Sequence, residues 1–416
     1  MLYILSFITI IASLTLLSNK GIKRFLIFIV CISILPFGLE IVPKLHAPRL
    51  LVIAFCLSII FRKSDLKVIQ DFPFKKLLFV LFISHIAIGI ADVRLNMIQS
   101  IYKPTIAFIE SFGCLLLGYV SCTKCSDEKS LFNVLNILAI IVSVYSLFSL
   151  TVGYDAYNSI FEGSDSLDGD RLRIASFFYN SHVGGLAMSI YLLILLYFNN
   201  KYGKISYVQA PVILLFIALL LTGSRSSFLD FAIGCIFFYI PVFFTSRHKT
   251  LKFISAVIII GILSSIIGET IISQFTDIFK DDGGKTGGSN FVMRLQQLYY
   301  SWQLFLEKPW FGHGFQYFWE VIKIQRGDLG DLLLGAESYI FILLIERGAI
   351  QILLITLFFI AMFRYFLKQK CIESYLCIAI TSAFLVNSIA TGNLYKWIFV
   401  MPFIGYYIRY LQLKQA

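Results

Sequence analysis

The sequence predicts an all-α protein, a polytopic transmembrane helical bundle of about 12–13 spans. Of its 416 residues 58% are hydrophobic and only 14% are charged, and the mean hydropathy is +0.82. Apolar runs follow one another almost end to end, and each approaches the roughly 20 residues that a helix needs to cross a bilayer core. This composition excludes a soluble multidomain protein, because most of the chain must be solvated by lipid.

The apolar spans follow in order along the chain. They are expected at 1–18, 24–39, 49–61, 76–91, 103–121, 130–152, 182–199, 206–222, 226–245, 251–269, 338–367, 373–390 and 396–411. The first has no basic leader and no small-residue cleavage site, so it is interpreted as a retained span and not a signal peptide. The short third span and the first leave the total between twelve and thirteen.

Basic residues in the short connections predict the orientation of the bundle. Lys and Arg concentrate in alternate connections, which the positive-inside rule assigns to the cytoplasm. The other set contains the two longest loops, 153–181 and 270–337. We therefore expect both long loops to face the periplasm or the cell exterior, and the C-terminal tail to be cytoplasmic.

The net charge of +11 could indicate nucleic acid as a partner, but the basic residues are dispersed among these connections. Membrane topology explains that distribution better, so no nucleic acid is expected. The eight cysteines lie mostly inside apolar runs, where a thiol behaves as a small hydrophobe. Cys122 and Cys125 form a lone CxxC without a second pair, which is weak evidence for a metal site.

The loop 270–337 contains an amphipathic helix by its periodicity. Apolar residues recur at helical spacing at Phe291, Leu295, Leu298, Trp302 and Phe305. The other face carries Arg294, Gln297, Ser301 and Lys308. Pro309 ends the helix, so we expect one long extracytoplasmic loop with a helix along the membrane surface or over a cavity.

Four arginines lie in the outward segments, where the positive-inside rule does not predict them: Arg171, Arg173, Arg225 and Arg294. Arg225 follows Thr222-Gly223-Ser224 in a tight turn between two spans. A guanidinium there is costly unless it meets an anion or an aqueous cavity, and its fork suits phosphate. The alternative is that Arg225 reaches the lipid headgroups or pairs with Asp230.

Four short motifs, in order, resemble the superfamily of O-antigen polymerases and O-antigen ligases, which share the Wzy_C-type domain. They are Arg173-Ile174-Ala175-Ser176-Phe177-Phe178-Tyr179-Asn180, Leu220 to Ser227, Lys308 to Phe315 after Arg294-Leu295, and Ala336 to Ile340 with Glu346-Arg347-Gly348. The resemblance covers roughly residues 170–350. It divides the chain into N-terminal membrane helices at 1–152, a catalytic-type core at 153–350 and C-terminal helices at 351–416.

The chain departs from the family pattern at three positions. Ligase-type members commonly carry His-Asn where this chain has Glu337-Ser338, and Gly where Ser176 stands. They usually have Pro after the asparagine, where this chain has Ser181. The missing histidine favours the polymerase branch over the ligase branch.

The resemblance implies a glycosyltransferase whose donor is a sugar on lipid pyrophosphate. Arginines can neutralise this leaving group, so neither a metal nor a cofactor is expected. The acceptor hydroxyl needs orienting and partial deprotonation, for which Glu337 is the candidate, with Arg225 as its catalytic companion. The alternative is that Glu337 caps the helix that follows.

The remaining candidate contacts concern the glycan. The motifs place Asn180, His313 and Tyr339 beside the expected site, although the middle residue of a Gly-x-Gly turn such as His313 is more often structural. Asp165, Asp168 and Asp170 resemble a metal-holding acidic patch, but an outward loop is more consistent with a solvated segment or glycan contact.

The sequence therefore predicts an inner-membrane polymerase of undecaprenyl-pyrophosphate-linked repeat units, acting outside the cytoplasm, as in O-antigen or capsule synthesis. Its partners would be the lipid-linked glycan, the bilayer and a copolymerase that regulates chain length. One alternative is an O-antigen ligase that transfers the glycan to lipid A-core. Another, from a different class, is a transporter or flippase of the same lipid, but paired halves with broken helices are not seen.

Overall fold

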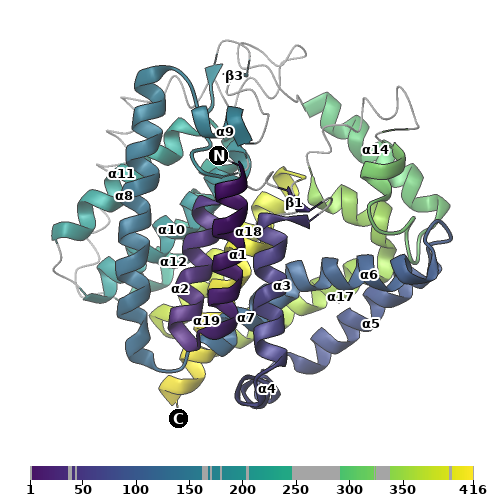
Figure 1. The fold of residues 1–416 in the computed structure, drawn as a ribbon, viewed down its shortest axis with the longest axis horizontal. Helices are drawn as coiled ribbons and strands as arrows, with labels where there is room; N and C mark the ends of the chain where they lie inside the picture. Colours follow the sequence, from purple (N-terminus) through teal and green to yellow (C-terminus); the bar gives the residue numbers. More distant parts are fainter. Residues whose placement is uncertain are drawn as a thin grey trace.

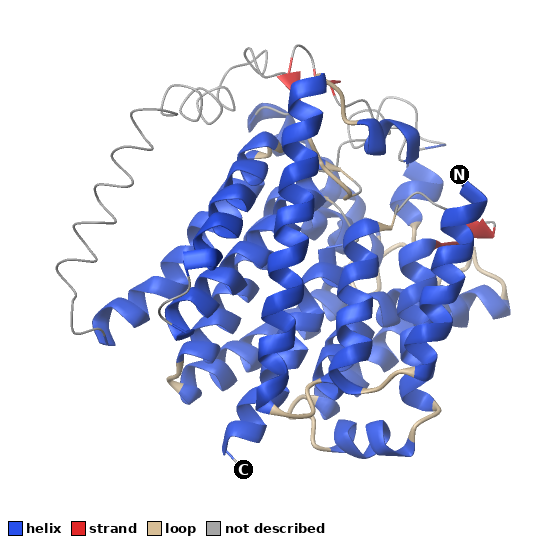
Figure 2. Cartoon of the chain, turned by 60° about the vertical axis from the view of Figure 1, so that its left-hand side comes forward, coloured by secondary structure: helices blue, strands red, loops and turns tan. Residues whose placement is uncertain are grey.

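The computed structural model describes residues 2–35, 40–42, 45–161, 167–168, 171–178, 180–202, 206–245, 291–322, 324, 338–392 and 396–415. Helices run side by side through the molecule, and the few strands lie at the end opposite the C-terminus (Figures 1 and 2). These are two short antiparallel pairs, β1 with β2 and β3 with β4. The prediction of an all-α polytopic bundle is confirmed.

The N-terminal elements cover the chain up to the first long loop. They are α1 (Leu2–Ser18), α2 (Gly21–Ile34), β1 (Glu40–Val42), β2 (Leu45–His46), α3 (Ala47–Ile60), α4 (Lys63–Gln70), α5 (Lys75–Ala91), α6 (Met97–Phe108), the π-helix η1 (Ile109–Gly113), α7 (Cys114–Ser121), the 3-10 turn η2 (Cys125–Asp127) and α8 (Glu128–Val152).

The second half begins with α9 (Ala156–Phe161) and the pair β3 (Leu167–Asp168) and β4 (Arg171–Leu172). The helices that follow are α10 (Ser181–Tyr202), α11 (Ser206–Leu221), α12 (Arg225–Thr245), α14 (Phe291–Glu307), the π-helix η5 (Phe318–Ile322), α17 (Tyr339–Gln369), α18 (Ile372–Ala390) and α19 (Lys396–Gln415).

Each expected span within the described ranges coincides with a helix, and the expected span at 251–269 lies outside them. Five of the described helices are long and apolar enough to cross a membrane. The pair α4 and α5, bent by 105°, adds a sixth if it forms one span. The total of twelve or thirteen spans stays a prediction.

Glycines set the closest helix contact in the described core. A Cβ on Gly118 of α7 would lie 1.7 Å from the Pro402 carbonyl oxygen of α19. A Cβ on Gly405 would lie 1.9 Å from the Leu115 carbonyl oxygen, so both helices approach through bare backbone. Small residues at such contacts are typical of helix packing in membranes, where van der Waals contact replaces the hydrophobic effect.

The amphipathic helix predicted at 291–308 is α14, and it ends at Glu307, before Pro309. Its inward side is mixed: the Gln297 and Ser301 side chains are buried together with Leu304 and Phe305, while Lys308 is exposed. Its apolar face is turned outward and carries a shallow groove of about 360 Å³ lined by Leu295, Leu298, Tyr299 and Trp302. These exposed apolar side chains fit an outward face that meets lipid.

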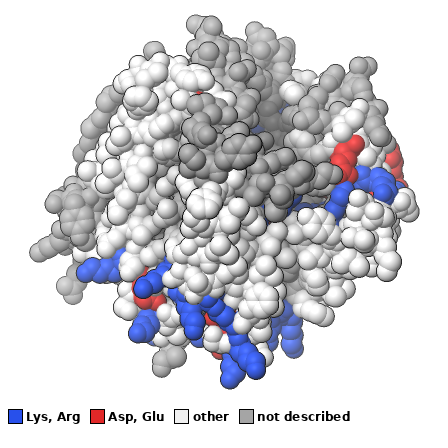
Figure 3. Space-filling model, viewed as in Figure 1, with Lys and Arg blue, Asp and Glu red and all other residues white. Residues whose placement is uncertain are grey.

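Charged residues of the described part of the molecule gather at one end and, in a smaller group, at one side (Figure 3). In Figure 3, Lys and Arg cover the end that carries the C-terminus and α4. The middle of the same face is almost free of visible Lys, Arg, Asp and Glu among the described residues. A concentration of Lys and Arg at one end of a helical bundle is typical of the cytoplasmic side of a membrane protein.

Candidate functional site

A serine-rich turn joins α11 to α12. Gly223 adopts φ +59°, a left-handed conformation that favours glycine and lets the chain reverse. The Ser224 Oγ lies 3.0 Å from Ser226 Oγ and 2.9 Å from Ser227 Oγ. It also lies 3.0 Å from Nδ1 of His182, the second residue of α10. Three hydroxyls and an imidazole thus form one hydrogen-bonded group at the N-terminus of α12.

The approach of α10 to α12 depends on Gly185, because a Cβ there would lie 1.9 Å from Ser227 Oγ. The Ser189 hydroxyl donates to the Ser227 carbonyl at 3.0 Å and fixes the same contact. Asn180 begins α10 as its N-cap, since its Oδ1 accepts the backbone N–H of Val183 at 2.9 Å. The predicted glycan contact Asn180 therefore has a structural role next to this group.

Arg173 lies against the same turn. Its Cγ would be 3.5 Å from a Cβ on Gly223. The next residue, Ile174, donates its backbone N–H to the Leu221 carbonyl at 3.1 Å, which ties the segment to the end of α11. The two motifs, far apart in the sequence, are therefore neighbours in the fold.

Ser176 occupies a position where the family pattern of the resemblance has glycine, and its φ is +59°. An L-residue pays a conformational penalty in this region, which explains the family preference for glycine. Its hydroxyl donates to the Val142 carbonyl of α8 at 3.3 Å, and the backbone N–H of Ala175 donates to Asp155 at 3.0 Å. These two contacts hold the strained segment against its neighbours.

Four cations lie within electrostatic reach of the His182 ring: Arg173, Lys396, Arg294 and Arg225. They come from the segment after β4, from the start of α19, from α14 and from the start of α12. We call these four residues with His182 the cationic cluster. Three of the arginines predicted from the sequence are thereby brought together.

Lys396 is a member that the sequence reasoning missed. Its side chain is 1% exposed, and its Nζ donates to the carbonyls of Asn387, at 2.9 Å, and Thr391. The Asn387 amide donates to the buried Asp230 carboxylate, which also attracts Lys396. The Thr391 carbonyl accepts a second bond, at 3.1 Å, from the N–H of Tyr339. The one feature of the sequence that could have indicated Lys396 is the presence of a lysine at the start of an apolar span.

Tyr339 therefore begins α17 one hydrogen-bonding group away from the cationic cluster. Two other predicted site residues, Arg171 and Glu337, lie partly or wholly outside the described part of the structure. Arg171 belongs to β4, paired with Asp168, and its side chain lies outside the described atoms. Glu337 lies outside the described residues. Within the described ranges, no three His, Cys, Asp or Glu side chains group as metal ligands would.

The turn after α14 packs into a break in α17. Gly348 interrupts the helix with φ +66° and ψ −173°. The break frees carbonyls that the turn then satisfies: Ile345 accepts the N–H of His313 at 2.8 Å, and Glu346 accepts that of Gly314 at 2.9 Å. This backbone pairing ties the Gly-x-Gly turn, and with it α14, to α17.

The His313 side chain is committed to the same turn. Its Nε2 lies 2.8 Å from the Leu304 carbonyl of α14, and its ring stacks on Tyr317 at 4.4 Å between centroids. Glu307 lies 3.7 Å away. These contacts match the structural alternative that the sequence left open for His313.

A second buried polar group lies between α5 and α17. The His85 Nδ1 is 2.7 Å from the Leu81 carbonyl, and its Nε2 is 3.1 Å from an Arg347 Nη. Because Arg347 can only donate, Nε2 accepts and the proton lies on Nδ1, so the ring is neutral. The Gln351 amide lies beside the ring, with its Nε2 3.1 Å from Nδ1, and its Oε1 accepts from Ser84 at 2.6 Å.

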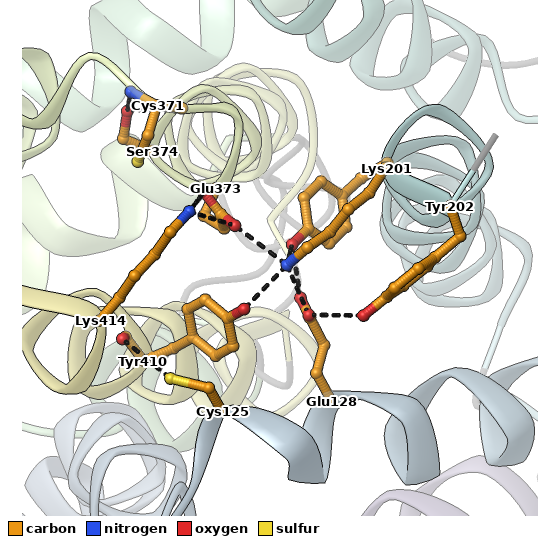
Figure 4. Close-up of polar contacts among 10 residues, drawn as sticks. Cys125, Glu128, Lys201, Tyr202, Cys371, Glu373, Ser374, Tyr410 and Lys414 are labelled. Atoms are coloured by element: carbon orange, nitrogen blue, oxygen red, sulfur yellow. Dashed lines mark hydrogen bonds and ion pairs between the residues drawn. The ribbon is translucent and has the colours of Figure 1, made fainter.

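A third polar group forms around Lys201 at the end of α10 (Figure 4). Its Nζ donates to Glu128 at 2.6 Å, Glu373 at 3.0 Å and the Tyr410 hydroxyl at 2.8 Å. Lys414 bonds the same Glu373 carboxylate at 3.1 Å. This group joins α8, α10, α18 and α19 and contains none of the predicted site residues.

The fold and the cationic cluster define a multi-helix membrane protein with a site suited to an anion. Residues 210–356 match the family model Wzy_C, described as O-antigen ligase. This match confirms the resemblance to the O-antigen ligase and polymerase superfamily over these residues. It includes Arg225, Arg294 and Tyr339, and it does not separate the polymerase branch from the ligase branch. No curated protein matches the chain.

Proposed function

We propose that this protein is a membrane glycosyltransferase that polymerises undecaprenyl-pyrophosphate-linked oligosaccharide repeat units. The observation that carries the proposal is the convergence of Arg173, Arg225, Arg294 and Lys396 on one histidine. Guanidinium groups bind phosphate oxygens by paired hydrogen bonds, and several of them can neutralise a pyrophosphate without a metal ion. The Wzy_C match supports the same class of substrate.

In this proposal the cationic cluster binds the leaving group. The acceptor hydroxyl oxygen forms a bond to C1 of the donor sugar while the bond from C1 to the pyrophosphate oxygen breaks. The hydroxyl proton passes to a base, for which Glu337 remains the candidate, and undecaprenyl pyrophosphate departs with the bonding electrons. Cations that meet the charge as it develops lower the barrier to this step.

The serine hydroxyls of the α11–α12 turn support the proposal because they supply further hydrogen-bond donors for the pyrophosphate. Ser224, Ser226 and Ser227 lie at the N-terminus of α12, where the helix dipole also favours an anion. His182, held by Ser224, orients this group beside Arg225.

We place the site at the outer face of the inner membrane. The end that carries the C-terminus is rich in Lys and Arg, which the positive-inside rule assigns to the cytoplasm (Figure 3). The cationic cluster is built from β4, the start of α12 and α14, which the charge alternation assigns to the opposite side. A copolymerase that sets chain length would act from that side.

The test is a reaction of the purified protein with its lipid-linked repeat unit. A ladder of longer lipid-linked products is expected. Transfer to lipid A-core without any ladder would overturn the polymerase assignment and establish the ligase, which the description of the matching family favours. Uptake of labelled lipid into sealed vesicles without polymer would instead establish a carrier.

A further inference from the structure

An ion pair joins the start of α3 to the middle of the helical stretch Met97–Ser121. The Nε of Arg49, in the first turn of α3, donates to Oε1 of Glu110. Glu110 lies in η1, the π-helical turn between α6 and α7, near the middle of the span Met97–Ser121. The two side chains remain partly exposed, at 16% and 21%.

Two features of this pair point to a ligand. Ionisable groups at mid-depth in a membrane protein face the bundle interior or an aqueous cavity, because contact with hydrocarbon is costly. Glu110 is such a group by its place in the helical stretch, and both side chains of the pair are partly exposed, so a polar ligand can reach them. In addition, π-helical turns widen the backbone and are frequent at functional sites.

Tyr339 connects this pair to the cationic cluster. Its ring lies within electrostatic reach of Glu110 and Arg347, from η1 and from α17 itself. Its backbone N–H shares the Thr391 carbonyl with Lys396, a member of the cluster. The Arg49–Glu110 pair and the cationic cluster thus both border the first turn of α17, which follows Glu337.

The chemistry of the two groups differs. The cationic cluster carries several positive charges and suits an anion, whereas Arg49 and Glu110 sum to zero charge. A carboxylate at this position repels pyrophosphate, but it accepts hydrogen bonds from sugar hydroxyls while the guanidinium donates to neighbouring oxygens.

We propose that Arg49 and Glu110, beside Tyr339, form the subsite that binds hydroxyl groups of the acceptor sugar. This inference rests on the proposed glycosyl transfer and adds to it a separate place for the second substrate. The donor pyrophosphate occupies the cationic cluster, and the acceptor approaches C1 from the side of η1.

The experiment separates the two subsites with two readouts. The first is binding of undecaprenyl pyrophosphate, which carries no sugar, to purified protein. The second is the polymer ladder made from the lipid-linked repeat unit of the source strain. Glu110→Gln is expected to bind undecaprenyl pyrophosphate within about twofold of wild type while polymer falls by roughly tenfold to a hundredfold, as expected when a charged hydrogen bond is lost.

A purely structural ion pair is distinguished by the double variant Arg49→Gln with Glu110→Gln. If the two charges only neutralise each other, removing both restores the polymer that the single variant loses. An acceptor subsite predicts that the double variant remains as defective as the single one. Recovery of polymer in the double variant, or full polymer in Glu110→Gln, would overturn the inference.

Lys103→Gln serves as the matched control, because Lys103 lies on α6, close to η1, and pairs with the exposed Glu320. It is expected to keep both readouts. Failure of the proposed function has a different signature: Arg225→Ala would then bind undecaprenyl pyrophosphate and make polymer as wild type does. Weak undecaprenyl pyrophosphate binding by Glu110→Gln alone would assign the pair to the donor and contradict the acceptor subsite.

Discussion

His182 is the residue at which the separate motifs of this chain meet. Ser224 fixes its Nδ1, and the surrounding cations come from four segments that are distant in the sequence. His182 therefore marks the place in the described fold where these cations come near one another, while Ser224 holds its ring. The individual positions therefore differ in what they contribute: charge at the arginines, geometry at His182.

Arg225 is expected to contribute both charge and shape. Arg225→Ala should lower polymer formation by roughly a hundredfold to a thousandfold, the usual loss when one donor to a developing anion is removed. Arg225→Lys should restore part of it, because the charge returns without the planar fork. Product ladders from equal amounts of purified protein measure both. Arg409→Ala, at the other end of the bundle, is the control and should leave the ladder unchanged. A full ladder from Arg225→Ala would contradict the role of Arg225 in binding the pyrophosphate.

Ser176 permits a test of backbone strain. Ser176→Gly should leave the melting temperature within a few degrees of wild type, because relief of about 1 kcal/mol of left-handed strain offsets the lost hydroxyl bond and a more flexible unfolded chain. Ser176→Val should lower it clearly, since a β-branched residue at φ +59° is strongly disfavoured. Thermal unfolding in detergent compares the two. Equal stability of the glycine and valine variants would refute the strain.

At the scale of elements, the break in α17 holds the turn that follows α14 in place. A continuous helix would have no free carbonyls for the turn that follows α14, and the Arg294 on α14 would lose its attachment. Gly348 combines a positive φ with close contact, because a Cβ would lie 2.6 Å from the Gly312 nitrogen. The break is thus a contact site, made of backbone atoms, for the Gly-x-Gly turn.

Gly348→Ala should therefore be more harmful than a glycine substitution elsewhere. Gly153, which ends α8, has a similar φ of +71° but no atom within 4 Å of an added Cβ. We expect Gly153→Ala to cost about 1 kcal/mol and Gly348→Ala several times that, because strain and overlap combine. Melting temperatures and protease cleavage between α14 and α17 report the difference. Identical losses in the two variants would show that the docked turn adds nothing.

At the scale of the whole molecule, the Lys201 group joins four helices at the end opposite the cationic cluster. Glu128 and Glu373 are each 1% exposed and share one ammonium (Figure 4). Two buried carboxylates without a cation would repel each other. The Lys201 group holds α8, α10, α18 and α19 against one another. Two of these helices, α10 and α19, carry His182 and Lys396.

Lys201→Ala should destabilise the bundle by about 3–5 kcal/mol, the usual effect of removing one partner of a buried pair. Binding of undecaprenyl pyrophosphate by the folded fraction should persist, because the cluster itself is intact. Adding Glu128→Gln should recover part of the melting temperature. A Lys201→Ala protein as stable as wild type would show that Lys414 alone neutralises Glu373.

The spans, the amphipathic helix and the three arginines were predictable, because apolar length and outward charge are properties of local sequence. The π-turn at Glu110 and the place of Lys396 were not, because they depend on packing between distant segments. Pro104 shows the reason: its ring fits only because Gly89 of α5 has no side chain, as a Cβ there would lie 2.6 Å from the Pro104 Cγ. The strand pair β1–β2 similarly forms only through register between short neighbouring segments.

The outward apolar face of α14 makes the surrounding lipid one of the conditions on which the position of this helix depends. Its inward side meets protein, and its outward apolar face, with Leu295 and Trp302, has lipid as its natural neighbour. We therefore expect acyl chains against this face to help hold α14, and Arg294 with it, in place. Transfer from a nanodisc to a short-chain detergent removes those acyl chains, so the purification medium becomes a structural variable on the same footing as a mutation.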